Sequence, residues 1–302
     1  MPSLVVTALA LLAAAAVALA GDPGGASTER VTVVATTTQA ADLARNVGGY
    51  RVEVVGLLAA NADPHEYEVR PRDLQRLADA DLVVRSGGDL DEWLQEAIEG
   101  AGTGAPVVTL LDAVRADGDD PHWWQDPRNA RLAVAAIERA LSAADPAGAD
   151  GHRASARAYE ARLDRLDRQV AECVARIPAE RRRLVTTHDA LGYYARRYGL
   201  EVVGAVIPSL STRGQPSAGE TAELVETIRE QGVRAIFAES SVGAKVEAAI
   251  AREAGATVGA PLWADTLGPP GSSGETYVDS IAANTRAIVE GLTGGETCSI
   301  DA

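Results

Sequence analysis

The sequence predicts an α/β protein with two lobes, each a parallel sheet covered by helices, and one long helix that connects them. Short β-branched runs alternate with amphipathic helical segments in both halves of the chain, and one long charged segment separates the halves. Alternation of this kind is typical of parallel sheets with helices packed on their faces. The chain has 302 residues, 46% of them hydrophobic, so two cores of ordinary size can be buried.

The first lobe is expected between residues 29 and 145. Its β-branched runs predict strands at Val31–Ala35, Val52–Leu57, Asp81–Arg85 and Val107–Leu110. Helical patterns follow these runs at Ala40–Asn46, Pro71–Ala78, Leu90–Glu99 and Asn129–Ala143. Asp126 and Pro127 precede the last of these helices and mark its start, since Asp is a good N-cap and Pro suits the first helical position.

A connecting helix is expected within residues 146–180. The segment Asp150–Arg176 contains no Gly or Pro after Gly151, and its apolar residues recur at helical spacing. It is longer than a typical domain helix, and Pro178 ends it. We therefore expect it to join the two lobes as a stiff helix.

The second lobe, residues 181–302, repeats the pattern of the first. Strands are predicted at Leu184–Thr187, Glu201–Val206, Ala235–Ala238 and Thr257–Leu262. Helices are predicted at Ala190–Tyr198, Ser217–Gln231, Val242–Glu253 and Thr276–Leu292. Ser217 and Glu220 form a Ser-x-x-Glu capping box at the start of one of them. Two lobes of this kind predict a ligand cleft between them.

The N-terminal residues 1–28 are expected to be a signal peptide and a leader. The apolar run Leu4–Ala20 ends in small residues and leads into the Gly-rich segment Gly21–Ser27, which is typical of a cleaved signal. No Lys or Arg precedes the run, so an uncleaved anchor is the alternative. No Cys follows it, so we expect no lipidated N-terminal cysteine. The sequence thus predicts an exported protein, in the periplasm or at the cell surface.

The charge and the cysteines narrow the class of protein. A net charge of −15 argues against a nucleic-acid partner, because phosphate binding needs clustered Lys and Arg. The charge is compatible with collecting cations, or simply with keeping an exported protein soluble. Export permits a disulfide between Cys173 and Cys298, but the sequence leaves their pairing open.

Three of the four histidines, and one aspartate, follow predicted strands. They are His65, His122, His188 and Asp265. In open α/β sheets the carboxyl edge of the strands is where ligands bind. If the edges of the two lobes face each other, these side chains form one site of three nitrogens and one oxygen. The fourth histidine, His152, opens the charged connecting segment, where we expect it to be solvated.

Imidazole and carboxylate groups suit zinc, and four protein ligands would close its coordination sphere. A closed site holds metal, whereas catalytic zinc keeps a position open for water. The acidic run Asp117-Gly118-Asp119-Asp120, just before His122, is expected to be a solvated loop.

Four sequence blocks resemble the zinc- and manganese-binding solute-binding proteins of ABC transporters, a family of periplasmic or cell-surface proteins. The resemblance runs from about Val31 to Leu292. The blocks are Asn61-Ala62-Asp63-Pro64-His65-Glu66-Tyr67-Glu68, Asp120-Pro121-His122-Trp123-Trp124-Gln125-Asp126-Pro127, Thr187-His188-Asp189-Ala190-Leu191-Gly192-Tyr193-Tyr194 and Ala264-Asp265-Thr266-Leu267-Gly268-Pro269.

The resemblance implies two α/β lobes with metal between them, and a membrane permease as the partner that receives the metal. It implies coordination by His65 and His122 from the first lobe and by His188 and Asp265 from the second. A histidine at the third of these positions is similar to the zinc members, whereas manganese members tend to have Glu there. We therefore expect Zn²⁺ as the transported ligand, with Mn²⁺ as the alternative.

Two other classes of protein compete with this interpretation. A zinc hydrolase would need an open coordination position and a general base, for which Glu66 and Glu239 are candidates. Both glutamates have simpler roles, as surface groups or as partners that orient a ligand histidine. A structural zinc or an adhesion role is the other alternative, but a site drawn from both lobes favours an exchangeable ligand.

Overall fold

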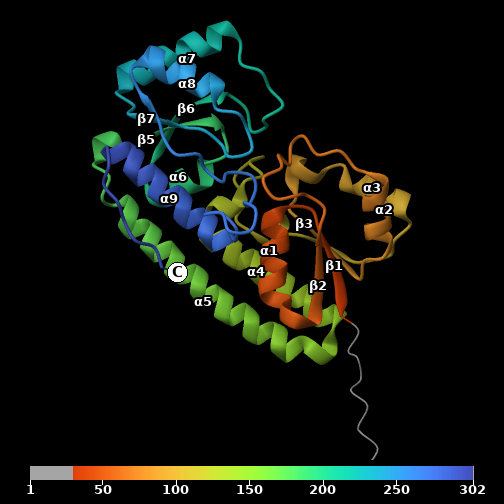
Figure 1. The fold of residues 1–302 in the computed structure, drawn as a ribbon. Coiled ribbons are helices and arrows are strands. Elements are labelled where there is room, and N and C mark those ends of the chain that lie inside the picture. Colours follow the sequence, from red (N-terminus) through yellow and green to blue (C-terminus); the bar gives the residue numbers. More distant parts are fainter. Residues whose placement is uncertain (1–29, 302) are drawn as a thin grey trace, which may run out of the picture.

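A computed structural model describes residues 30–301 and contains two parallel sheets of four strands, each flanked by helices (Figure 1). This architecture confirms the predicted α/β class. The expected signal peptide and leader, residues 1–28, lie outside the described residues. Within residues 30–301, no helix combines the length and the apolar character needed to cross a membrane.

The first sheet has the strand order β2-β1-β3-β4. Its strands are β1 (Val31–Ala35), β2 (Val52–Gly56), β3 (Leu82–Arg85) and β4 (Val107–Thr109). All pairs are parallel, with Val33 opposite Val54 on one side and Leu82 on the other. The central strands β1 and β3 are apolar except for Thr32 and the terminal Arg85, because helices cover both of their faces.

The second sheet repeats the same order as β6-β5-β7-β8. Its strands are β5 (Arg183–His188), β6 (Glu201–Ile207), β7 (Ala235–Phe237) and β8 (Thr257–Val258). The strand predicted at Thr257–Leu262 is therefore shorter than expected. Pro261 has no N–H to donate to a ladder, and pairing resumes only as an isolated bridge between Leu262 and Glu239. That bridge brings the chain back to the carboxyl edge of the sheet.

Helices pack on both faces of each sheet. In the first half these are α1 (Thr38–Gly48), α2 (Pro71–Ala78), α3 (Leu94–Ala101) and α4 (Pro127–Ala144), and in the second α6 (Gly192–Tyr198), α7 (Ala218–Gln231), α8 (Lys245–Ala254) and α9 (Tyr277–Thr293). Leu77 of α2 and Leu94 of α3 bury one face of the first sheet. Ile228 of α7 and Ile250 of α8 bury the corresponding face of the second.

The predicted helix caps are present. Asp126 accepts a hydrogen bond from the Arg128 N–H at the start of α4, with Pro127 at the first helical position. The capping box of α7 forms between Ser217 and Glu220. The helix expected at Leu90–Glu99 begins only at Leu94, because a 3₁₀ turn, Gly88–Asp91, precedes it.

The long helix α5 (Ala149–Val174) lies beside both halves of the molecule (Figure 1). It packs on α1 and α4 of the first half and on α9 of the second. These helices share one hydrophobic core with strands of both sheets. A disulfide between Cys173, near the end of α5, and Cys298 joins this helix to the C-terminal segment. The sequence had left open whether these two cysteines pair.

The prediction that His152 is solvated is wrong. The first turn of α5 packs against α1, and the His152 ring is only 1% exposed. Its Nε2 lies 3.1 Å from Asp145 Oδ2 and its Nδ1 lies 3.5 Å from the Val47 carbonyl oxygen. Both ring nitrogens of His152 therefore have oxygen partners inside the fold.

Candidate metal centre

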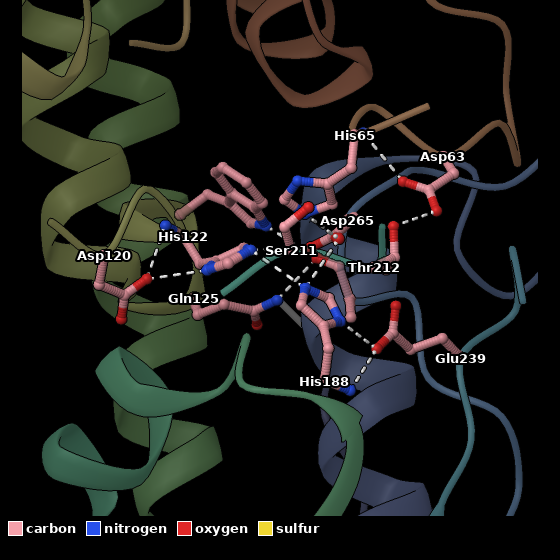
Figure 2. Close-up of polar contacts among 12 residues, drawn as sticks. Asp63, His65, Asp120, His122, Gln125, His188, Ser211, Thr212, Glu239 and Asp265 are labelled. Carbon is pink, nitrogen blue, oxygen red and sulfur yellow. Dashed lines mark hydrogen bonds and ion pairs between the residues drawn. The ribbon is translucent and has the colours of Figure 1, made fainter. Parts of the chain in front are cut away.

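His65 lies in the loop between β2 and α2. Asp63 shapes this loop, since its Oδ1 accepts a hydrogen bond from the His65 N–H at 2.9 Å. Its other oxygen, Oδ2, accepts a hydrogen bond of 2.6 Å from the Thr212 hydroxyl, which belongs to the second half (Figure 2). The loop that carries His65 is thus attached to the opposite lobe beside the site.

His122 lies in the loop between β4 and α4. Asp120 Oδ1 accepts a hydrogen bond from the His122 N–H at 3.0 Å and lies 2.8 Å from His122 Nδ1. The expectation of a solvated loop is therefore wrong for Asp120, which is 9% exposed. An aspartate two residues before a histidine can bond both its backbone and its ring, and this local geometry buries the carboxylate.

His188 is the last residue of β5. Its Nδ1 lies 2.5 Å from Glu239 Oε1, and its N–H donates to the same oxygen at 3.3 Å. Glu239 follows β7, the neighbouring strand, and is buried. Glu66, the other candidate base, is exposed beside His65.

Asp265 belongs to the second half but its loop is bonded to the first. The Ala264 carbonyl accepts hydrogen bonds from Trp124 Nε1 and Gln125 Nε2, at 2.9 and 2.7 Å. Beyond Asp265, the Leu267 N–H donates to the Thr38 hydroxyl at 2.8 Å. These contacts on both sides fix the position of the Asp265 carboxylate between the lobes. Gln125 and Thr38 gave no signal in the sequence, because their partners are distant along the chain.

The structure brings the four predicted residues together. His65, His122, His188 and Asp265 each offer one atom to a cluster in which all atoms lie within 4.8 Å of one another (Figure 2). His65 Nε2 and His188 Nε2 are each 3.1 Å from Asp265 Oδ2, and His122 Nε2 is 3.4 Å from Oδ1. His122 Nε2 and His188 Nε2 are 3.3 Å apart.

These four distances, 3.1–3.4 Å, are close to the spacing of ligand atoms around a tetrahedral divalent ion. Four ligand atoms placed about 2.0–2.1 Å from one ion lie about 3.3–3.4 Å from each other. All four side chains are buried, with exposed fractions from 0% to 4%. The arrangement therefore has the size and the donor set of a closed four-ligand site.

The protons of two histidines can be placed from their partners. A carboxylate only accepts hydrogen bonds, so Asp120 and Glu239 require a proton on Nδ1 of His122 and His188. With that tautomer, a ring presents the lone pair of Nε2 to the centre whenever it is neutral. Two such lone pairs at 3.3 Å repel each other unless a cation lies between them. His65 Nε2 and both Asp265 oxygens also lack a hydrogen-bond partner among the described residues.

The charges of the site shift two pKa values strongly. Burial lowers the pKa of His188, but the carboxylates of Asp265 and Glu239 outweigh it and hold that pKa well above its usual range. Burial raises the pKa of Asp265, but His188 and His122 outweigh it and hold that pKa well below its usual range. Both shifts favour a positive charge beside the Asp265 carboxylate.

A comparison with known families agrees with this geometry. Residues 33–291 match the family model of the periplasmic zinc-uptake complex component A, ZnuA. The chain belongs to this family. The chain is also similar to the manganese-binding lipoprotein MntA of Bacillus subtilis, with 34% identity over 283 residues, or 89% of this chain and 92% of that protein. MntA of Halalkalibacterium halodurans is 31% identical over 270 residues, or 88% of this chain and 89% of that protein.

Solved structures of periplasmic metal-binding proteins share the fold of this chain. The periplasmic zinc-binding protein TroA of Treponema pallidum superposes with a TM-score of 0.81 at 30% identity, over 87% of this chain and 99% of that one. A cadmium-bound periplasmic metal-binding protein of Candidatus Liberibacter asiaticus superposes with a TM-score of 0.80 at 25% identity, over 87% of this chain and 100% of that one. The zinc-uptake family thus combines this two-lobed fold with relatives named for zinc and for manganese.

Proposed function

We propose that this protein is an extracytoplasmic zinc-binding component of an ABC transporter, which holds one Zn²⁺ and delivers it to a membrane permease. The ligands are His65, His122, His188 and Asp265. The observation that carries the proposal is the convergence of their four ligand atoms, buried between the lobes, at the spacing of a tetrahedral ion.

Zinc is proposed over manganese because of the donor set. Three imidazoles and one carboxylate suit Zn²⁺, whereas Mn²⁺ favours oxygen ligands and more of them. The competing candidate is a manganese-binding member of the family, and it is supported by the names of the two MntA relatives. The same four side chains would hold either ion.

Binding is proposed over catalysis because four protein ligands leave no coordination position for water in a tetrahedral site. The candidate bases offer no support for a hydrolase. Glu239 is engaged with His188, and Glu66 is exposed beside His65 and forms no part of the four-atom cluster. The role of Glu239 is to orient a ligand.

Delivery to a permease requires release, and the site is built to couple release to movement of the lobes. We propose residues 29–145 and 181–302 as the two lobes and 146–180 as the connector. Two ligands come from each lobe, so the ion favours the arrangement in which both lobes contact it. The Cys173–Cys298 disulfide is consistent with an oxidising, extracytoplasmic compartment.

The test is to strip the full chain with a chelator, reload it with Zn²⁺ and excess Mn²⁺ together, and measure the metals retained per chain. One zinc per chain is the expected result. Retained manganese would keep the transport role and reverse the metal, while retention of neither ion would overturn the proposal.

A further inference from the structure

The loop that carries Asp265 changes its hydrogen-bonding partners abruptly along the chain. Trp263, two residues before Asp265, is bonded within the second lobe. Its N–H donates to the Asn284 side chain of α9 at 2.8 Å, and its carbonyl accepts from the same side chain at 2.9 Å. Gly268 also bonds within that lobe, since its N–H donates to the Gly274 carbonyl at 2.8 Å. The residues between these two points are bonded to the first lobe instead.

Two buried side chains of the first lobe hold the peptide directly before Asp265. Trp124 Nε1 and Gln125 Nε2 donate to the same Ala264 carbonyl, at 2.9 and 2.7 Å, and Gln125 reaches from the His122 loop toward Asp265 (Figure 2). A carbonyl oxygen has two lone pairs, so both are used. Gln125 is fully buried, and water therefore cannot replace its hydrogen bond if the loop moves away.

A second attachment to the first lobe follows Asp265. The Leu267 N–H donates to the hydroxyl of Thr38, at the start of α1, at 2.8 Å. The Leu267 carbonyl accepts from the N–H of Asn61, in the loop that carries His65, at 2.9 Å. Asp265 belongs to the second lobe by chain order, but it lies between two attachments on the first.

His188 is held in the opposite way, by its own lobe. Its N–H and Nδ1 contact Glu239, and its carbonyl accepts from the Ala190 N–H and the Thr186 hydroxyl. All three partners belong to the second lobe. Its Nε2 meets His122 of the first lobe at 3.3 Å, at the proposed position of the ion. The ligands that the chain divides two and two are therefore held three and one.

We propose that Trp124 and Gln125 are positioning residues that keep Asp265 on the first lobe when the two lobes separate. The first lobe then retains three of the four ligands as a half-site, and His188 alone leaves with the second lobe. The half-site consists of His65, His122 and Asp265. An entering ion binds the half-site first, and the return of His188 completes its coordination. The inference rests on the proposed function, since it assumes that these residues bind the transported metal.

Hydrogen exchange of single backbone amides in the full chain, with and without zinc, tests which ligands move together. The Leu267 amide reports on the attachment of the Asp265 loop to the first lobe. The Asp117 amide donates to the Tyr193 hydroxyl at 2.8 Å, and it reports on the contact of the first lobe with α6, which follows His188. We expect removal of zinc to speed exchange at Asp117 and to leave exchange at Leu267 unchanged.

The variants test the two donors. Trp124→Phe and Gln125→Met each remove one donor to Ala264 and keep most of the apolar bulk. Trp123→Phe is the matched control, because that equally buried ring donates to Ser86 within the first lobe, at 3.2 Å. In the metal-free chain, W124F/Q125M should speed exchange at Leu267 at least about fivefold, the effect of one lost hydrogen bond. Zinc release to a chelator should be faster by a similar factor, and the control should change neither rate.

The outcomes separate this inference from the function beneath it. Equal rates in W124F/Q125M and W123F would overturn the positioning role, and each single variant shows which donor matters if the double variant unfolds. Exchange that speeds at Leu267 together with Asp117 would mean that Asp265 travels with the second lobe. No change at either amide would mean that His188 does not leave. Either result overturns the inference, while one zinc retained per wild-type chain leaves the proposed function standing. A wild-type chain that retains no zinc would overturn that function itself.

Discussion

Two buried histidine–carboxylate pairs lie in different regions of this molecule, and they differ in what surrounds them. His188 pairs with Glu239 at the carboxyl edge of the second sheet, and His152 pairs with Asp145 where α5 meets α1. Both rings are almost fully buried. The second nitrogen of His152 faces a carbonyl oxygen, that of Val47. The second nitrogen of His188 faces both the Asp265 carboxylate at 3.1 Å and another histidine nitrogen, His122 Nε2, at 3.3 Å.

The comparison teaches that burial and a carboxylate partner do not by themselves make a ligand. In the His152 region, Asp145 also accepts two hydrogen bonds from Arg51, at 2.6 and 2.7 Å. Arg51 chiefly, with help from His152, holds the pKa of Asp145 well below its usual range. That region is a satisfied structural network. Around His188, ring nitrogens and carboxylate oxygens of four residues converge, and the proposed cation would bind between them.

The largest expected effect comes from removing the ligand. His188→Ala should weaken zinc binding by more than about 100-fold, since even the partners of ligand histidines contribute up to that amount. His152→Ala should leave zinc affinity unchanged, although it removes an equally buried ring. Chelator competition on both variants measures the difference. Equal zinc affinities for the two variants would contradict the assignment of His188.

Acid should weaken zinc binding more than an ordinary histidine would allow. Zn²⁺ must displace the proton from His188 Nε2, and the pKa of His188 is raised well above its usual range. As the pH is lowered, zinc affinity should therefore fall about tenfold per pH unit. This fall should begin while the pH is still above about 6.5, the ordinary imidazole value. Titrations across this range test the point. A zinc affinity that stays constant until below about pH 6.5 would contradict it.

The same raised pKa has the opposite effect on the metal-free protein. A raised folded-state pKa contributes stability that is fully present below the unfolded-state value of about 6.5. That contribution of His188 is lost as the pH rises through its folded-state pKa. Zinc binding should thus stabilise the protein most at the higher pH values, where the metal-free protein has lost this contribution of His188. Thermal unfolding with and without zinc measures the difference.

His152→Ala should change stability instead of binding. It removes a buried ring and leaves the Val47 carbonyl without its partner, which should cost about 2 kcal/mol of unfolding free energy. In a chain of this size that corresponds to a melting temperature about 3–4 °C lower. Arg153→Ala is the control, because that exposed neighbour should contribute less than about 0.5 kcal/mol. An unchanged melting temperature for the His152 variant would argue against its structural role.

The smallest expected effect concerns the contact between the lobes. Thr212→Val keeps the shape of the side chain and removes the hydroxyl that donates to Asp63. One hydrogen bond is worth about 1 kcal/mol, so zinc affinity should fall roughly fivefold, mainly through faster dissociation. Thr221→Val is the control, since its hydroxyl bonds only the Ser217 carbonyl of its own helix. Stopped-flow release of zinc to a chelator would detect the change, and identical rates would show that the contact does not hold the site closed.

Local signals predicted most of the fold. The run Val31–Ala35 is strand β1 to the residue, and Pro71–Ala78 is helix α2 to the residue. Periodicity and caps are local properties, so they can be read without tertiary information. The shortened strand at Thr257–Val258 and the burial of His152 were not predicted, because both depend on which distant segments pack there.

The members of the proposed site were chosen from the sequence, but their geometry was not predicted. Position after strands selected His65, His122, His188 and Asp265, and the structure brings those four side chains together. Their convergence required the lobes to face each other, which no local spacing encodes. Asp63 and Asp120 had a shared signal, an aspartate two residues before each histidine. Thr212 had none, since its partner Asp63 lies in the other lobe.

Zinc-edge X-ray absorption on the chain loaded with one zinc tests the central claim most directly. Four ligand atoms at about 2.0–2.1 Å, with scattering from three imidazoles, is the predicted result. His188→Ala should reduce the imidazole count by one, and His152→Ala should leave it at three. A zinc ion with one imidazole or none, or with six oxygen ligands, would contradict the site described between the two lobes.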